Sequence, residues 1–139
     1  MKLDLILYPM FSMFLLTFCV ITLGYINRVR AVRSAGLRIS YFKHNSGAEP
    51  PEFMQRTDQN FTNLFETPVI FYAVIITSYI TSQVDIAGLI LAWAYVASRI
   101  GHSYIHIRHN NILLRLKLFL LSLFVLLALC INQFIQLIN

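Results

Sequence analysis

The fold is decided by residues 112–138, whose sequence is ILLRLKLFLLSLFVLLALCINQFIQLI and in which only Arg115 and Lys117 carry a charge. Comparable apolar stretches occupy residues 3–26, 60–81 and 86–107. Each holds roughly 20 residues or more, enough for a helix to cross a hydrocarbon core about 30 Å thick. The short turns at residues 82–85 and 108–111 make sequential helices antiparallel neighbours. The sequence therefore predicts an all-α, integral membrane, antiparallel four-helix bundle.

Composition supports a bilayer environment for the whole chain. Of the 139 residues, 58% are hydrophobic and only 12% are charged, against about a quarter charged in an ordinary soluble domain. We therefore expect residues 1–139 to form a single four-helix transmembrane domain, with a long connection at residues 27–59. Cys19 and Cys130 lie in apolar stretches without a metal-ligand spacing, which predicts neither a disulfide nor a nucleophile.

The basic residues predict the orientation. If the chain crosses four times, ten of the eleven Lys and Arg residues fall on one side, and only Lys2 is left for the other. The ten are Arg28, Arg30, Arg33, Arg38, Lys43, Arg56, Arg99, Arg108, Arg115 and Lys117. By the positive-inside rule, this side is cytoplasmic and both termini are extracytoplasmic. The net charge of +5 thus indicates topology, and we expect no nucleic-acid partner.

The second stretch carries a polar stripe. Arg56, Gln59, Asn63 and Glu66 follow at spacings of three, four and three, which places them on one face of a helix. Since an unpaired carboxylate inside the apolar boundary costs several kcal/mol, Glu66 needs a cation, hydrogen bonds or a wet cavity. Pro68 lacks a backbone donor, so a kink is expected just beyond the stripe.

A second stripe lies near the end of the third stretch, where Arg99, His102 and His106 follow at spacings of three and four. Arg115 lies near the start of the fourth stretch. We expect the two stripes to converge on a polar pocket for a small zwitterionic or anionic ligand near the cytoplasmic surface. Two alternatives stay open. Glu66 and Arg99 could form a purely structural ion pair, and the histidines could bind zinc, although no HExxH glutamate accompanies them and the sequence predicts no metal site.

These stripes resemble motifs of the MAPEG family, the membrane-associated proteins of eicosanoid and glutathione metabolism, whose members include microsomal glutathione transferases. Residues 56–68, RTDQNFTNLFETP, match the leading arginine, the N-x-x-E core and the following proline of the family's second-helix motif. Residues 99–106, RIGHSYIH, match its third-helix motif R-x-x-H/Y-x-x-x-Y except at the last position. Arg115 lies at the offset where the family often places a catalytic arginine.

The resemblance implies a homotrimer with glutathione, as co-substrate, bound between neighbouring subunits. The pocket would be lined by Arg30, Arg56, Asn63, Glu66, Arg99, His102 and His106, and Arg115 would be catalytic. The sequence departs from the family motifs at two positions, which weakens the resemblance: Gln59 replaces a second arginine and His106 replaces a tyrosine. Losing the charge at Gln59 removes a hydrogen bond of roughly 1.5 to 3 kcal/mol.

The function expected from the resemblance is a glutathione-dependent transferase or peroxidase that acts on hydrophobic electrophiles at the cytoplasmic membrane surface. Its partners would be membrane lipid and a hydrophobic small-molecule substrate. The main alternative is a non-enzymatic MAPEG-like protein that binds a lipid head group or a protein partner through the same pocket. A transporter or channel subunit ranks last, because a polar path would have to continue through stretches that are nearly all apolar.

Overall fold

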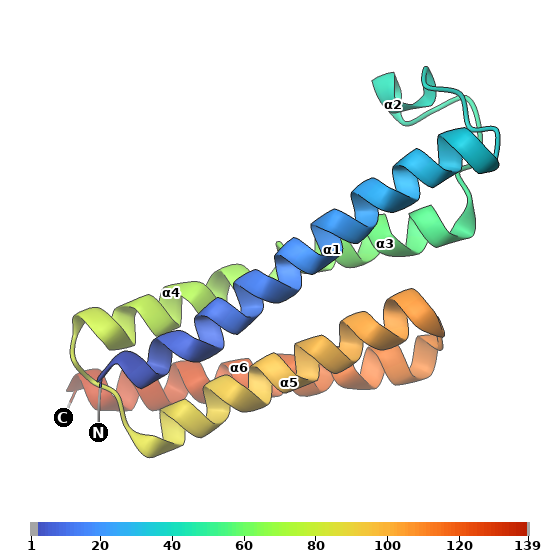
Figure 1. The fold of residues 1–139 in the computed structure, drawn as a ribbon. Coiled ribbons are helices and arrows are strands. Elements are labelled where there is room, and N and C mark those ends of the chain that lie inside the picture. Colours follow the sequence, from blue (N-terminus) through green and yellow to red (C-terminus); the bar gives the residue numbers. More distant parts are fainter. Residues whose placement is uncertain (1–2, 139) are drawn as a thin grey trace.

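The computed structural model describes residues 3–138 and is helical throughout its regular elements (Figure 1). In chain order these are η1 (Leu3–Ile6), α1 (Leu7–Ser34), α2 (Tyr41–His44), α3 (Glu52–Asn63), α4 (Thr67–Ile80), α5 (Ile86–Arg108) and α6 (Ile112–Ile138). The predicted all-α class is confirmed for this part of the chain. Lys2, the basic residue assigned alone to the extracytoplasmic side, lies outside the described residues.

Three helical segments within residues 3–138 are long and apolar enough to cross a membrane: Leu3–Ser34, Glu52–Ile80 and Ile112–Ile138. They correspond to η1 with α1, to α3 with α4, and to α6. The fourth predicted span forms as α5, but it is not among them. Its second half carries Arg99, His102, Ser103 and His106, which lower its hydropathy.

The predicted connection at residues 27–59 is wrong, because much of it is helical. Helix α1 continues through Arg28, Arg30 and Arg33, since arginine and alanine favour helix and no glycine interrupts them before Gly36. Gly36 then adopts a φ of +71°, and the Leu37 amide returns to the Ala31 carbonyl at 3.0 Å. Helix α3 begins directly after Pro51. The irregular connection is thus confined to residues 35–51, around the short α2.

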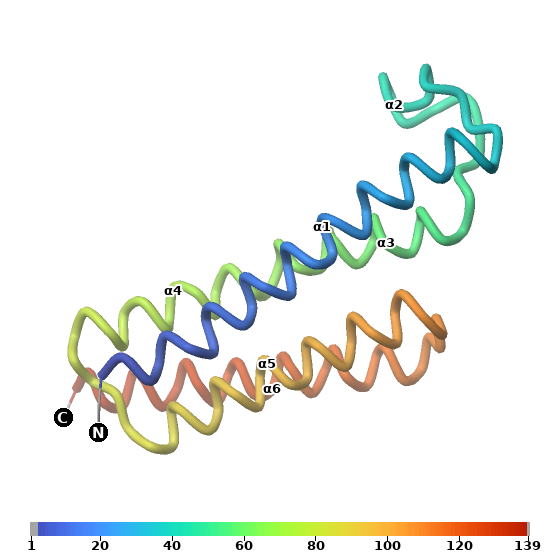
Figure 2. The backbone as a smooth tube through the Cα atoms, in the orientation of Figure 1, coloured from blue at the N-terminus to red at the C-terminus, as the bar shows by residue number. Residues whose placement is uncertain are grey.

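The long helices lie along the long axis of the structure, which therefore has two distinct ends (Figure 1). The start of η1 and the end of α6 lie at one of them, which we name the terminal end. The connection at 35–51 and the α5–α6 turn lie at the other, the basic end. Helix α1 contacts α3, and α5 contacts α6 along its length. The tube in Figure 2 shows these two pairs moving apart toward the basic end.

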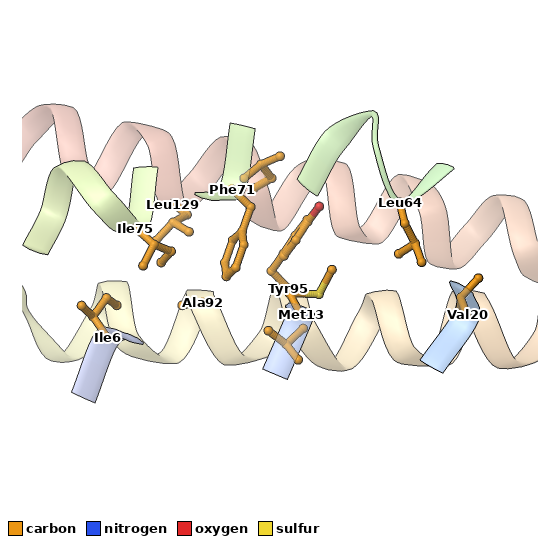
Figure 3. Close-up of a cluster of buried hydrophobic side chains, with 11 residues drawn as sticks. Ile6, Met13, Val20, Leu64, Phe71, Ile75, Ala92, Tyr95 and Leu129 are labelled. Atoms are coloured by element: carbon orange, nitrogen blue, oxygen red, sulfur yellow. The ribbon is translucent and has the colours of Figure 1, made fainter. Parts of the chain in front are cut away.

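The apolar core occupies the terminal half, where the two pairs are close. Met13 from α1, Phe71 and Ile75 from α4, and Tyr95 from α5 are all fully buried (Figure 3). The rings of Phe71 and Tyr95 stack with centroids 4.6 Å apart. Large apolar side chains also cover the outer faces of α1 and α6, which is the pattern expected where lipid replaces water as the solvent.

A break separates α3 from α4 at residues 64–66, so the kink expected at Pro68 is confirmed and is sharper than a bend. Pro68 sits in the first turn of α4, where a missing backbone N–H costs nothing. The Thr67 hydroxyl lies 3.1 Å from the Tyr95 hydroxyl and links the start of α4 to α5. The break thus lies against α5, at the edge of the core.

A cluster of hydrogen bonds surrounds Asp85, the N-cap of α5, at the terminal end. We call it the Asp85 cluster. The carboxylate accepts from the Gly88 amide at 2.8 Å, from Asn132 Nδ2 at 2.9 Å and from Gln136 Nε2 at 3.3 Å. One turn away, Ser78 donates to the Gln133 side-chain carbonyl. These bonds tie α6 to the α4–α5 connection.

We expect Gly88→Ala to destabilise the protein, because a Cβ there would lie 2.8 Å from Asp85 Oδ1 and 3.1 Å from Asn132 Nδ2. Disturbing the cap should cost about 1 to 2 kcal/mol. The measurement is thermal unfolding in detergent. Gly101→Ala is the matched control on the same helix, since its Cβ would meet Leu118 at an ordinary 3.7 Å. Equal stability of the two variants would contradict a stabilising role for the Asp85 cluster.

Candidate functional site

Arg99 is the largest fully buried side chain among the described residues, with none of its surface exposed. Its Nη2 donates to the Asn63 carbonyl at 2.8 Å. In an unbroken helix that carbonyl would accept from the amide of Thr67, four residues on. The break before Pro68 removes that partner, and the guanidinium replaces it. Arg99 therefore stabilises the end of α3 across the space between the helix pairs.

His102, His106 and Arg115 form a contact group where α5 meets α6. The His102 Nδ1 lies 3.0 Å from the Arg115 backbone carbonyl. Arg115 Nη1 lies 3.1 Å from His106 Nε2 and donates to Asn110 Oδ1 at 3.1 Å. Asn110 adopts a left-handed φ of 50° in the turn between the two helices. The turn thus brings the Arg115 side chain back onto α5.

These contacts fix which ring nitrogens carry hydrogen. A backbone carbonyl only accepts, so His102 Nδ1 must be protonated, and in the neutral ring Nε2 is then a bare acceptor. A guanidinium only donates, so His106 Nε2 must be the bare nitrogen and Nδ1 carries the hydrogen. His102 Nε2 and His106 Nδ1 are buried and have no hydrogen-bond partner within residues 3–138. The group therefore offers one acceptor and one donor.

A cavity of about 240 Å³ lies beside this group. Asn63, His102 and Arg115 supply its polar side, and Ile112, Leu116 and Phe119 supply its apolar side. Of the two predicted stripes, Asn63 on α3 and His102 on α5 line this cavity together with Arg115 on α6, and the other residues of the stripes do not. A lining that combines polar and apolar side chains suits a ligand that has a charged part and a hydrophobic part.

Four residues of the predicted stripes or their neighbours lie away from this cavity. Arg30 is exposed, with its guanidinium 4.7 Å from the centre of the Phe53 ring. Arg56 pairs with Glu52, one turn earlier on α3. Gln59 and Glu66 are exposed, and Glu66 forms no ion pair within the described chain. The alternative of a structural ion pair between Glu66 and Arg99 is not what the structure contains.

The buried polar face of α3 differs from the one that the spacing indicated. Thr57 and Asn60 are fully buried, next to Met54 and Leu64 at helical spacing, whereas the predicted stripe occupies the more exposed face. Asn27 on α1 donates to Thr57 Oγ1 at 2.7 Å, and Arg28 pairs with Asp58 at 3.0 Å. The spacing of 54, 57, 60 and 64 was the signal that could have revealed this face.

The buried atoms near the cavity fit an anionic, peptide-like ligand. Arg99 Nε and Nη1 are buried without a partner in the described part of the chain, as is His106 Nδ1. These are donors, and buried donors normally have partners. A carboxylate is a fitting acceptor for a guanidinium, and His102 Nε2 could accept from an N–H or S–H group. Glutathione carries two carboxylates, amide N–H groups and a thiol, so these residues fit it chemically.

Comparison with known proteins gives one family. The sequence model of the MAPEG family matches residues 6–135, nearly the whole chain. No curated protein and no solved structure matches the chain. The match extends beyond the two stripes to all of the long helices.

The contact between Arg99 and the Asn63 carbonyl predicts energetic coupling with Pro68. Arg99→Met should lower stability by about 1 to 3 kcal/mol, because it leaves the partly buried carbonyl of Asn63 without its donor. In the Pro68→Ala background the helix can close the break and satisfy that carbonyl, so the same substitution should cost about 1 kcal/mol less. Thermal unfolding of the four proteins in detergent measures the coupling. If the stability changes of the two substitutions are additive, Arg99 does not act by donating to the Asn63 carbonyl.

Proposed function

This chain belongs to the MAPEG family, the membrane proteins of glutathione and eicosanoid metabolism, and we propose that it is a glutathione-dependent transferase or peroxidase. Its second substrate would be a hydrophobic electrophile taken from the membrane. The observation that supports the proposal is the cavity that His102, Arg115 and Asn63 line together with Ile112, Leu116 and Phe119. The cationic and polar side chains suit the tripeptide, and the apolar side chains suit the electrophile.

Glutathione would be held mainly by α5. The unpaired donors of Arg99 and the Nδ1–H of His106 would bind carboxylate groups, because charge-assisted bonds to a guanidinium are among the strongest available. Asn63 lines the same cavity and would bind an amide of the peptide. His102 Nε2 would accept a hydrogen bond from the thiol or from the amino group. Every one of these groups is supplied by a helix, which favours a rigid site.

Arg115 would activate the thiol. A thiol attacks only as the thiolate, and a nearby permanent cation stabilises that form. Both contacts of Arg115 use Nη1, which leaves its other N–H groups for the sulfur. The thiol proton passes to water, the sulfur attacks the electrophilic carbon, and the leaving group departs with its bonding electrons. With a peroxide, the sulfur attacks oxygen, the O–O bond breaks and the alkoxide takes a proton from water. A second glutathione thiol then converts the sulfenic acid to the disulfide and releases water.

A homotrimer would complete the site, with α5 as the fourth span of each bundle. The cavity of about 240 Å³ lies below the roughly 300 to 1,000 Å³ of ordinary ligand pockets, which supports a contribution from a neighbouring subunit. Arg30, Arg56 and Glu66 lie outside the cavity on more exposed surfaces and would reach glutathione across the subunit boundary. We place the basic end in the cytoplasm and both termini outside it, following the distribution of arginine and lysine.

A second candidate is a MAPEG protein that binds a lipid head group or a protein partner without catalysis. Two observations favour it. Gln59 supplies no charge where the family motif has an arginine, and Arg56 is already paired with Glu52. Weaker glutathione binding would follow. The two experiments below separate this candidate from the enzyme.

We expect Arg115→Ala to lower glutathione-dependent turnover of a generic aromatic electrophile. Each unit by which the thiol pKa rises costs about tenfold in thiolate at neutral pH, so a loss of about tenfold to a hundredfold is expected. Lys117→Ala is the matched control, since Lys117 is an exposed cation on the same helix and does not line the cavity. Wild-type activity that does not exceed that of Arg115→Ala would remove Arg115 from the reaction.

Glutathione should also raise the thermal stability of the purified protein in detergent. A ligand at one hundred times its dissociation constant adds about 2.7 kcal/mol to the stability of the state that binds it. An equimolar mixture of glutamate, cysteine and glycine is the control, because it supplies the same groups unlinked. Stabilisation without turnover would support the second candidate, and no stabilisation would contradict glutathione as the ligand.

A further inference from the structure

A second recess lies on the other side of α5, between α5 and α1, with a volume of about 280 Å³. Leu16 and Leu23 line it from α1, and Ile100 and Ile107 line it from α5. We call it the α1–α5 groove. Because successive residues of a helix turn by about 100°, Ile100 and Ile107 point away from the face that carries His102 and His106. The groove is therefore separate from the proposed glutathione cavity.

Three side chains with polar groups, Ser103, Tyr104 and Arg108, stand in the otherwise apolar lining on the α5 side. Arg108 lies where the groove reaches the basic end; it is exposed, and neither ion pair of the described residues involves it. Ser103 is buried, so its hydroxyl offers no surface to a ligand. Among residues 3–138, no acidic side chain lines the groove.

The order of groups along the groove matches one class of ligand. From the basic end inward come the cation of Arg108 and an apolar channel that follows α1 for about 10 Å, from Leu23 to Leu16. A glycerophospholipid presents a phosphate and then an acyl chain in the same order. An unpaired arginine favours a head group with net negative charge over a zwitterionic one, since the latter carries its own cation.

We propose that the α1–α5 groove binds an anionic glycerophospholipid from the leaflet at the basic end. The phosphate pairs with Arg108, and one acyl chain lies along Leu16 and Ile100. The basic residues gathered at this end raise the local concentration of anionic lipid. The lipid would then fill the recess of about 280 Å³ between α1 and α5.

Cys19 lines the groove and is exposed, which provides a probe of its occupancy. In the Cys130→Ser protein, Cys19 is the remaining thiol, and its alkylation by a small uncharged maleimide can be timed in a neutral detergent. Phosphatidylglycerol should slow this labelling more than phosphatidylcholine does. Because one arginine near an anionic lipid surface is worth about fivefold in affinity, Arg108→Gln should shift the protecting phosphatidylglycerol concentration upward by about fivefold.

Two controls separate site binding from general effects. Arg38→Gln removes an exposed cation from the 35–51 connection, so it should leave protection unchanged. The Cys19→Ser protein retains Cys130, which lines a different recess between α4 and α6, and its labelling should not distinguish the two lipids. Protection that is equal with phosphatidylcholine, or that survives Arg108→Gln at the same concentration, overturns the proposal.

Two further outcomes identify other occupants and also overturn the proposal. Oleate that protects Cys19 at lower concentrations than phosphatidylglycerol would assign the groove to a free fatty acid. A thiol that stays unreactive in detergent without lipid would mean that a second copy of the chain covers it. None of these outcomes depends on glutathione, so the result stands apart from the proposed catalytic function.

Discussion

The bond from buried Arg99 to the carbonyl of Asn63 joins the two halves of the structure. A guanidinium without water needs acceptors, and a broken helix needs a donor for the carbonyl that it exposes. The carbonyl gains its donor from Arg99 Nη2, while Nε and Nη1 of the same guanidinium stay without a partner among the described residues. The bond also places the end of α3 beside α5, which brings Asn63 to the cavity next to His102 and Arg115. The polar site therefore exists because α3 does not continue into α4.

Hydropathy and helix breakers were enough to predict most of the fold. The long apolar stretches became helices, and Pro68 marked the discontinuity between α3 and α4. The extent of α1 was missed, because arginine ends an apolar run without ending a helix, and the chain remains helical until Gly36. The Asp85 cluster was not predicted either, since the hydrogen-bond partners of Asp85, Asn132 and Gln136, lie about fifty residues away in the sequence. Local patterns carry no information on such pairs.

The buried face was predicted correctly on α5 but not on α3. The spacing of Arg99, His102 and His106 identified a face that is buried. On α3 the charged stripe drew attention, but a single subunit buries the neutral residues Thr57 and Asn60 instead, because they need no counter-charge. Glu66 and Arg56 remain on more exposed surfaces. Helical spacing identifies a face, but only the neighbouring helices decide whether that face points inward.

The Asp85 cluster also helps to fix the position of Arg115. The leucine contacts of α6 are nearly interchangeable, so they define its register poorly. The directed bonds of Asn132 and Gln136 fix that register at the terminal end, and the contacts of Arg115 with α5 fix it at the basic end. Asn132 and Arg115 are 17 residues apart on α6, or about 25 Å. A shift of α6 at Asp85 would therefore displace a cation about 25 Å away.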